Sequence, residues 1–255
     1  MPSEFQTQYS HYANPPTLFL AVQVFAAKLN GNTPYSGTPS RLLGDPAAGR
    51  SILAAIYPKL RKHYEWFRRT QVGGNGTLYG RPGSDLNQGY RWRGRTPQHI
   101  LTSGLDDYPR AQPPHPGDLH VDALCWVGTM AMALKESSAF LGEREDEALF
   151  SSHEIDIIRS VDGVHWSEAQ RAYCDTRVVN DGHVEKICHK GYISLFPFFT
   201  KLMSPDHPHL GAVLDLIRDP EELWSPYGLR SLSVKDEFYG TDENYWRSPV
   251  WININ

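Results

Sequence analysis

Cysteine is scarce in this chain, and its scarcity limits the classes of protein to which the chain can belong. Only Cys125, Cys174 and Cys188 occur among 255 residues. Three cysteines are too few for a disulfide framework, although Cys174 and Cys188 could pair. No C-x-x-C spacing is present, and the eleven histidines show no metal-ligand spacing. We therefore expect neither a metal nor another cofactor.

Long runs of one charge sign and long apolar runs are also lacking. The net charge is −4, which gives no electrostatic reason to expect nucleic acid or an anionic membrane as partner. The longest apolar window, residues 18–29, contains Gln23 and Lys28 and is too short to span a bilayer. The first eight residues lack the basic and apolar segments of a signal peptide. We expect no membrane contact from this segment.

Apolar residues are plentiful and recur mainly at helical spacing. They make up 40% of the chain, which is enough to bury a core and argues against disorder. Asn14 is expected to cap a first helix, and Asp45 a second that Pro58 splits or kinks, with two pieces expected. Because no βαβ alternation is visible, we predict an all-α domain. Further helices are expected over residues 143–159, 166–175 and 210–217, and a short strand over residues 183–189.

A glycine-rich segment interrupts the helical pattern between residues 73 and 97. Thr77-Leu78-Tyr79 and Tyr90-Arg91-Trp92 are strand candidates on either side of a turn at Pro82-Gly83. The segment is therefore predicted to be a long irregular insertion with a β-hairpin. Asn75-Gly76-Thr77 within it is a sequon for N-glycosylation, a weak sign of a secretory location.

The most informative feature is a group of four carboxylates interleaved with aromatic residues and an arginine. Asp106 and Asp107 lie in Ser-Gly-Leu-Asp-Asp-Tyr-Pro-Arg over residues 103–110. Asp118 and Asp122 lie in Asp-Leu-His-Val-Asp-Ala-Leu-Cys-Trp over residues 118–126. A sugar-cleaving site needs an acid that protonates the glycosidic oxygen, together with groups that hold and stack the sugar. On composition alone, an ordinary turn is the stronger interpretation of the first run.

These two runs resemble glycoside hydrolase family 63, which includes the glucosidases that process N-glycans, and the resemblance reverses that preference. It extends over nearly the whole chain in the expected order. The other matching segments are Asn-Pro-Pro-Thr at 14–17, Tyr-Glu-Trp-Phe-Arg-Arg-Thr-Gln at 64–71, Tyr-Arg-Trp-Arg-Gly-Arg at 90–95 and Glu-Asn-Tyr-Trp-Arg-Ser-Pro-Val-Trp at 243–251.

The resemblance implies an (α/α)6 toroid with the active site at one end. Residues 1–255 would form part of a single glucosidase catalytic domain that lacks its first and last helices. The implied activity is inverting hydrolysis of the terminal α-1,2-linked glucose of the N-glycan precursor Glc3Man9GlcNAc2. The glucosylated oligosaccharide would be the partner. The implied location is the endoplasmic reticulum lumen, where members of the family are held by an N-terminal anchor that we do not find here.

The resemblance also assigns roles to individual residues. Asp106 would be the general acid, presented by a sharp turn at Gly104. Arg110 would hold sugar hydroxyls or lock Asp106, and the i, i+4 pair Asp118 and Asp122 would share one helix face and bind substrate. The remaining substrate-binding candidates are Asp107, Trp126, Tyr90, Trp92, Tyr245, Trp246 and Arg247.

The second carboxylate that inversion requires has no counterpart here. In the family it is a glutamate beyond the last matching segment, so we expect the isolated chain to be nearly inactive. Three alternatives remain open. The chain could be a trehalase-like or other α-glucoside hydrolase, a non-catalytic glycan-binding remnant, or a truncated product that does not fold alone.

Overall fold

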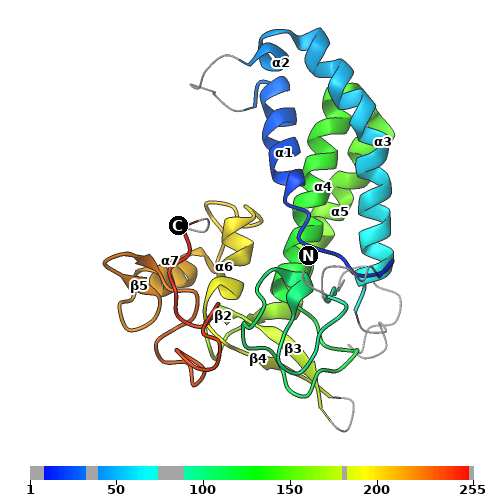
Figure 1. The fold of residues 1–255 in the computed structure, drawn as a ribbon. Helices are drawn as coiled ribbons and strands as arrows, with labels where there is room; N and C mark the ends of the chain where they lie inside the picture. Colours follow the sequence, from blue (N-terminus) through cyan, green and yellow to red (C-terminus); the bar gives the residue numbers. More distant parts are fainter. Residues whose placement is uncertain (1–8, 33–39, 74–88, 180–182, 253–255) are drawn as a thin grey trace.

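The longest helices of the protein lie side by side and form one end of the molecule. The computed structural model describes residues 9–32, 40–73, 89–179 and 183–252. Figure 1 shows the long helices α1, α3, α4 and α5, with short α2 between α1 and α3. Their bounds are α1 Leu18–Leu29, α2 Arg41–Gly44, α3 Pro46–Gln71, α4 Val121–Leu141 and α5 Arg144–Ser160.

Helix α4 is the centre of this group because it is apolar on almost every side. Every residue from 121 to 131 is buried, and α1, α3 and α5 all pack against it. A helix with this pattern is stable only when neighbours surround it. Gly128 allows Leu202 to approach the backbone of α4 closely, since a Cβ at this position would meet Leu202 Cδ2 at 2.8 Å. The helix ends at Gly142, whose φ of 81° suits glycine.

The other end of the molecule is built from short elements and loops. Helix α6 (Tyr192–Phe199) lies beside the lower end of α4, and α7 (Leu210–Arg218) packs on α6 on the side away from α4 (Figure 1). The irregular segment 89–120 covers the start of α4 and contains the 3-10 turn η3 (Leu101–Ser103). Three antiparallel two-stranded sheets complete this end, namely β1 (Trp166–Ser167) with β2 (Ala172–Tyr173), β3 (Asp175–Val178) with β4 (Val184–Ile187), and β5 (Trp224–Ser225) with β6 (Gly228–Leu229).

The helices confirm the all-α prediction only in part, because small two-stranded sheets are also present, and the expected break at Pro58 is wrong. Asp45 caps α3 as expected, because its carboxylate accepts hydrogen bonds from the backbone N–H groups of Ala47 and Ala48. The helix then runs unbroken past Pro58, which is exposed. The carbonyl that loses its intrahelical bond on that side can be solvated, while the opposite face of α3 packs on α4. The first helix begins at Leu18, with Thr17 rather than Asn14 at its N-cap.

The helix expected over residues 166–175 is also wrong, because these residues form the hairpin β1–β2 and the start of β3. Trp166 lies opposite Tyr173, and their ring centroids are 5.1 Å apart. Arg171 in the turn has a φ of 50°, which does not fit a helix. An aromatic pair across two strands stabilises a sheet, and here it outweighs the helical spacing. The strand expected over residues 183–189 is confirmed as β4.

A disulfide joins Cys174 to Cys188 across the β3–β4 hairpin, while Cys125 is free and buried in α4. None of the described helices is long and apolar enough to cross a membrane. Thr77-Leu78-Tyr79 and the sequon at Asn75 lie outside the described residues. Tyr90 bridges to Val72 rather than belonging to a longer strand.

Candidate active site

Asp106 is presented by a compact turn that its own loop stabilises. The 3-10 turn η3 ends at Gly104, whose φ of 75° is the left-handed conformation that glycine adopts easily. The Ser103 hydroxyl accepts a hydrogen bond from Leu105 N at 3.1 Å. The Asp106 carbonyl accepts one from Ile100 N at 2.8 Å, which closes the loop behind the side chain. The sharp turn expected at Gly104 is therefore confirmed.

The Asp106 carboxyl is partly buried and forms no hydrogen bond with any described residue. Burial raises its pKa above the ordinary value, and the neighbouring Asp107 carboxylate raises it further. Glu243 acts in the same direction, whereas His99 opposes it. His99 and Glu243 pair with each other, with 3.0 Å between His99 Nε2 and Glu243 Oε1. A carboxyl with a raised pKa and no partner remains available to give up a proton.

Asp107 ties the motif loop (residues 103–110) to the last described segment of the chain. Its buried carboxylate accepts hydrogen bonds from Tyr245 N at 2.9 Å and Trp246 N at 2.6 Å. Its carbonyl accepts another from Arg247 Nε at 2.8 Å. Asp107 therefore brings the residues of the last family-like segment next to Asp106, although nearly 140 residues separate them.

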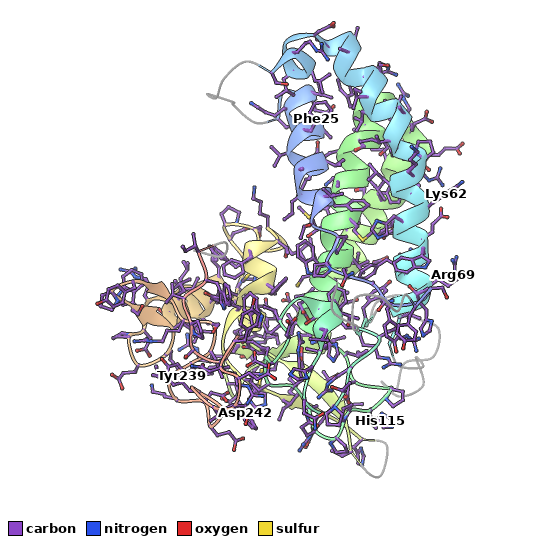
Figure 2. All side chains as sticks on the ribbon, in the orientation of Figure 1. Phe25, Lys62, Arg69, His115, Tyr239 and Asp242 are labelled. Atoms are coloured by element: carbon purple, nitrogen blue, oxygen red, sulfur yellow. A yellow bond between two sulfur atoms is a disulfide. The ribbon has the colours of Figure 1, made fainter. Side chains whose placement is uncertain are left out.

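An aromatic cluster lies on this segment. The Trp246 and Trp251 rings stack with centroids 4.7 Å apart, and Tyr245 packs edge-on against Trp251. Trp246 is buried, but Tyr245 is 45% exposed. Arg247 binds the Asp242 carboxylate, and Figure 2 shows Asp242 and Tyr239 together in this part of the molecule. Of these rings, Tyr245 is the most exposed and offers the largest surface for stacking on a sugar.

Arg110 does not contact Asp106 and instead forms the centre of a buried ion cluster. Its guanidinium donates to both carboxylate oxygens of Asp122, at 3.0 and 2.8 Å, and to Asp175 Oδ2 at 2.7 Å. Asp122 also accepts from Trp92 Nε1 at 2.9 Å, and Asp175 from Val121 N at 2.9 Å. Of the two roles expected for Arg110, the pairing with Asp106 is therefore wrong, because both Nη atoms donate to Asp122 and Asp175 instead. Contact of Arg110 with sugar hydroxyls stays a prediction.

This cluster joins three segments that are distant in sequence. Arg110 lies in the motif loop, Asp122 in the first turn of α4 and Asp175 at the start of β3. Although burial opposes ionisation, the Arg110 guanidinium holds the pKa of Asp175 at about 2, and the hydrogen bond from Val121 N acts in the same direction. Burial likewise lowers the pKa of Arg110, but the two carboxylates outweigh it and raise that pKa. Arg110 and Asp175 are therefore both charged at neutral pH.

The depressed pKa of Asp175 predicts a specific loss of stability in acid. A carboxylate whose pKa falls on folding stabilises the folded state above its ordinary pKa, here 3.8, and this contribution is lost as the pH approaches 2. We expect the difference in unfolding free energy between wild type and D175N to be constant above about pH 5 and to shrink between about pH 4 and pH 2. Urea titrations across this range measure it. A difference that stays constant down to pH 2 would contradict the assignment.

Asp118 lies outside helix α4, so the i, i+4 face expected for Asp118 and Asp122 is wrong. The helix begins at Val121, after an extended His120. Asp118 is buried and pairs with Arg95 Nη1 at 3.0 Å. It also accepts hydrogen bonds from the backbone N–H groups of His115 at 2.9 Å and Val178 at 3.3 Å. Burial nevertheless raises the pKa of Asp118.

The remaining substrate-binding candidates, Tyr90, Trp92 and Trp126, are buried and contact other protein side chains. The Tyr90 hydroxyl accepts a hydrogen bond from Arg68 Nε at 3.1 Å, and Trp92 is fully buried against Asp122 and Phe67. Trp126 is 7% exposed and packs edge-on against Phe196. Contact of these residues with substrate stays a prediction. Asp175 was not among the residues predicted from the sequence, and no local pattern could have indicated its pairing with Arg110.

Two hollows adjoin this region. One of about 40 Å³ lies between His99, Tyr108 and Arg247, and it has room for little more than water. The other has a volume of about 320 Å³ and lies on the far side of Arg95. Asp106 lines neither of them. Within the described ranges no group of three His, Cys, Asp or Glu side chains is arranged to hold a metal ion.

Comparison with known proteins gives consistent matches over the whole chain. The family model for the glycosyl hydrolase family 63 C-terminal domain matches residues 1–255. A probable mannosyl-oligosaccharide glucosidase of Schizosaccharomyces pombe is 44% identical over 272 residues, which cover 100% of this chain and 34% of that protein. The mannosyl-oligosaccharide glucosidase of Saccharomyces cerevisiae is 39% identical, with the same coverage. The chain thus spans about a third of the length of these relatives.

A solved structure matches as well. The family 63 mannosylglycerate hydrolase from Thermus thermophilus, determined in complex with glucose, aligns with a TM-score of 0.65. The alignment covers 100% of this chain and 64% of that protein at 18% identity. A similarity at this identity concerns the fold alone.

Proposed function

The chain belongs to glycosyl hydrolase family 63, and on this basis we propose that it forms part of the catalytic domain of a glucosidase that processes N-glycans. The substrate is the terminal α-1,2-linked glucose of Glc3Man9GlcNAc2, which is hydrolysed with inversion. Helices α1, α3, α4 and α5 belong to an (α/α)6 toroid. The whole chain, residues 1–255, lies within that single domain. The names of the two yeast relatives support the substrate class.

Asp106 supplies the proton in this reaction. The observation that carries this assignment is its environment, a partly buried carboxyl with a raised pKa and no hydrogen bond within the described residues. Protonated Asp106 gives its proton to the glycosidic oxygen as the bond to the anomeric carbon breaks. The leaving sugar then departs as a neutral hydroxyl. A carboxyl already held by a protein donor would be less able to do this.

The other acidic candidates position the site rather than react. Asp107 fixes Tyr245 and Trp246 beside Asp106, and Asp122 orients Arg110 and Trp92. Tyr245 offers its exposed ring to the sugar, and Trp246 and Trp251 pack edge-on against that ring. Arg247 holds the same segment to the Asp107 carbonyl. We also propose that no residue of this chain is the general base. Glu243 is the nearest acid in the family-like segment, but it is engaged by His99.

We propose the endoplasmic reticulum lumen as the location. The Cys174–Cys188 disulfide supports this proposal, because disulfides persist in oxidising compartments and are rare in the cytosol. The names of the yeast relatives point to the same pathway of glycan processing.

Glucose release tests the proposed function. The assay uses a purified full-length protein, that is, one that carries this chain within the complete catalytic domain. We expect kcat/KM for Glc3Man9GlcNAc2 to exceed that for trehalose by at least about 100-fold. A site built to hydrogen-bond the hydroxyl groups of the glycan rejects a ligand that leaves the polar groups of the site unpaired. Proton NMR should detect the β-anomer first, as inversion requires. A preference for trehalose would favour the trehalase-like alternative. Calorimetric binding of the glycan without glucose release would favour a non-catalytic glycan-binding protein.

A further inference from the structure

The hollow of about 320 Å³ beside Arg95 has a chemical character unlike that of a glycan site. It lies between the N-terminal segment, which contributes Tyr12, and the irregular segment 89–120. His115 is on its rim, and Figure 2 shows this residue on the side of the lower end opposite Asp242. The volume is at the lower limit for a small-molecule site.

Two histidines of the lining have tautomers that their partners determine. His120 Nδ1 accepts a hydrogen bond from Trp92 N at 3.1 Å, and His115 Nδ1 accepts one from Gly117 N at 3.0 Å. In the neutral imidazole the proton must therefore be on Nε2, so both Nε2 atoms are donors. His120 is 2% exposed, and its Nε2 has no hydrogen-bond partner among the described residues. Burial and the nearby Arg110 lower the pKa of His120, which keeps the ring neutral.

Three arginines of the lining, Arg91, Arg93 and Arg95, lie at alternate positions in the segment that follows Tyr90, which turns at Arg93 and Gly94. The Arg91 guanidinium makes no hydrogen bond to any described residue. Burial lowers its pKa, and repulsion from Arg93 lowers it further. Arg93 uses only Nε, which donates to the Thr70 carbonyl at 2.8 Å. Arg91 and Arg93 therefore retain donors for a ligand.

The single carboxylate of the lining offers little to a ligand. Asp118 is already engaged by Arg95, His115 N and Val178 N. The hollow thus presents three arginines against one aspartate, and its available polar groups are almost all donors. Such a lining needs a ligand that is rich in acceptors and negatively charged.

We propose that this hollow binds a small molecule through a doubly charged oxyanion, a phosphate or a sulfate. Arg91 and Arg93 contact its oxygens through the guanidinium donors that no described residue uses. The site is separate from the proposed proton donor, because Asp106 does not line it.

Isothermal titration calorimetry with inorganic phosphate and with sulfate tests this site in the purified full-length protein. We expect saturable binding of both ions at low ionic strength. Sodium chloride at equal ionic strength and glucose should give no saturable heat. R91Q should weaken phosphate binding by at least about tenfold, since it removes a charge-assisted contact, and R93Q should also weaken it. R144Q is the matched control, because exposed Arg144 begins α5 at the other end of the molecule.

Several outcomes would overturn the proposal. Absence of saturable phosphate binding to the wild type would do so without any variant. Equal weakening by R91Q and R144Q would mean that binding of the ion depends only on the net charge of the protein. Saturable binding of glucose in place of the anions would make the hollow a sugar subsite. None of these results depends on glucose release, so they leave the assignment of Asp106 unaffected.

Discussion

D106N in the full-length protein is expected to lower kcat for glucose release from Glc3Man9GlcNAc2 by about 10²–10⁴-fold, the usual contribution of a general acid. Asparagine has nearly the same shape, but its amide has no acidic proton to transfer to the glycosidic oxygen. Because the Asp106 carboxyl has no hydrogen bond within the described part of the chain, its loss should leave the fold intact. Steady-state kinetics with the purified oligosaccharide measure the effect, and the thermal midpoint should stay near that of the wild type.

D215N serves as the matched control for D106N. Asp215 lies on α7 and forms an exposed pair with Arg171, with 3.5 Å between Arg171 Nη2 and Asp215 Oδ2. The same substitution there removes one carboxylate and one surface pair of little energetic weight. We expect wild-type kinetics. If D215N lost as much activity as D106N, the effect of D106N would not reflect the proposed site.

R110M is expected to destabilise the protein by about 3–5 kcal/mol, because it leaves Asp122 and Asp175 buried next to each other without their cation. The two carboxylates are 0% and 6% exposed in their side chains, so water cannot replace the guanidinium. The cost should appear as a lower urea midpoint of unfolding. Trp92 reports on the same region, since its indole N–H donates to Asp122.

R177M is the control for R110M. Arg177 pairs with Glu185 across β3 and β4, but both side chains are more than a third exposed. Loss of such a surface pair should cost less than about 1 kcal/mol. An R110M protein whose unfolding free energy lies within about 1 kcal/mol of the wild type would show that the cluster does not hold the motif loop, α4 and β3 together.

Features set by neighbours in sequence were predictable from the sequence. Asp45 caps α3 and Gly104 turns the motif loop, since each depends only on local backbone geometry. Features set by tertiary packing were not. The face of α3 that packs on α4 carries the helix past Pro58, and the Trp166–Tyr173 pair turns an expected helix into a hairpin.

The candidate site divides in the same way. The residue types and the presentation of Asp106 followed from the motif and the resemblance. The partners did not, because Arg110 meets Asp175 across 65 residues and Asp107 meets Tyr245 across 138. The helical spacing of Asp118 and Asp122 was misleading, because α4 begins only at Val121. Long-range pairing of this kind leaves no periodic signal in a single sequence.

The most direct test of Asp106 as proton donor compares two leaving groups on the same variant. Fluoride leaves an anomeric carbon with little need for a proton, whereas the glycosidic oxygen of the oligosaccharide needs one. D106N should therefore lose about 10²–10⁴-fold in kcat on the oligosaccharide but less than about tenfold on α-glucosyl fluoride. An equal loss on both substrates would contradict proton donation by Asp106.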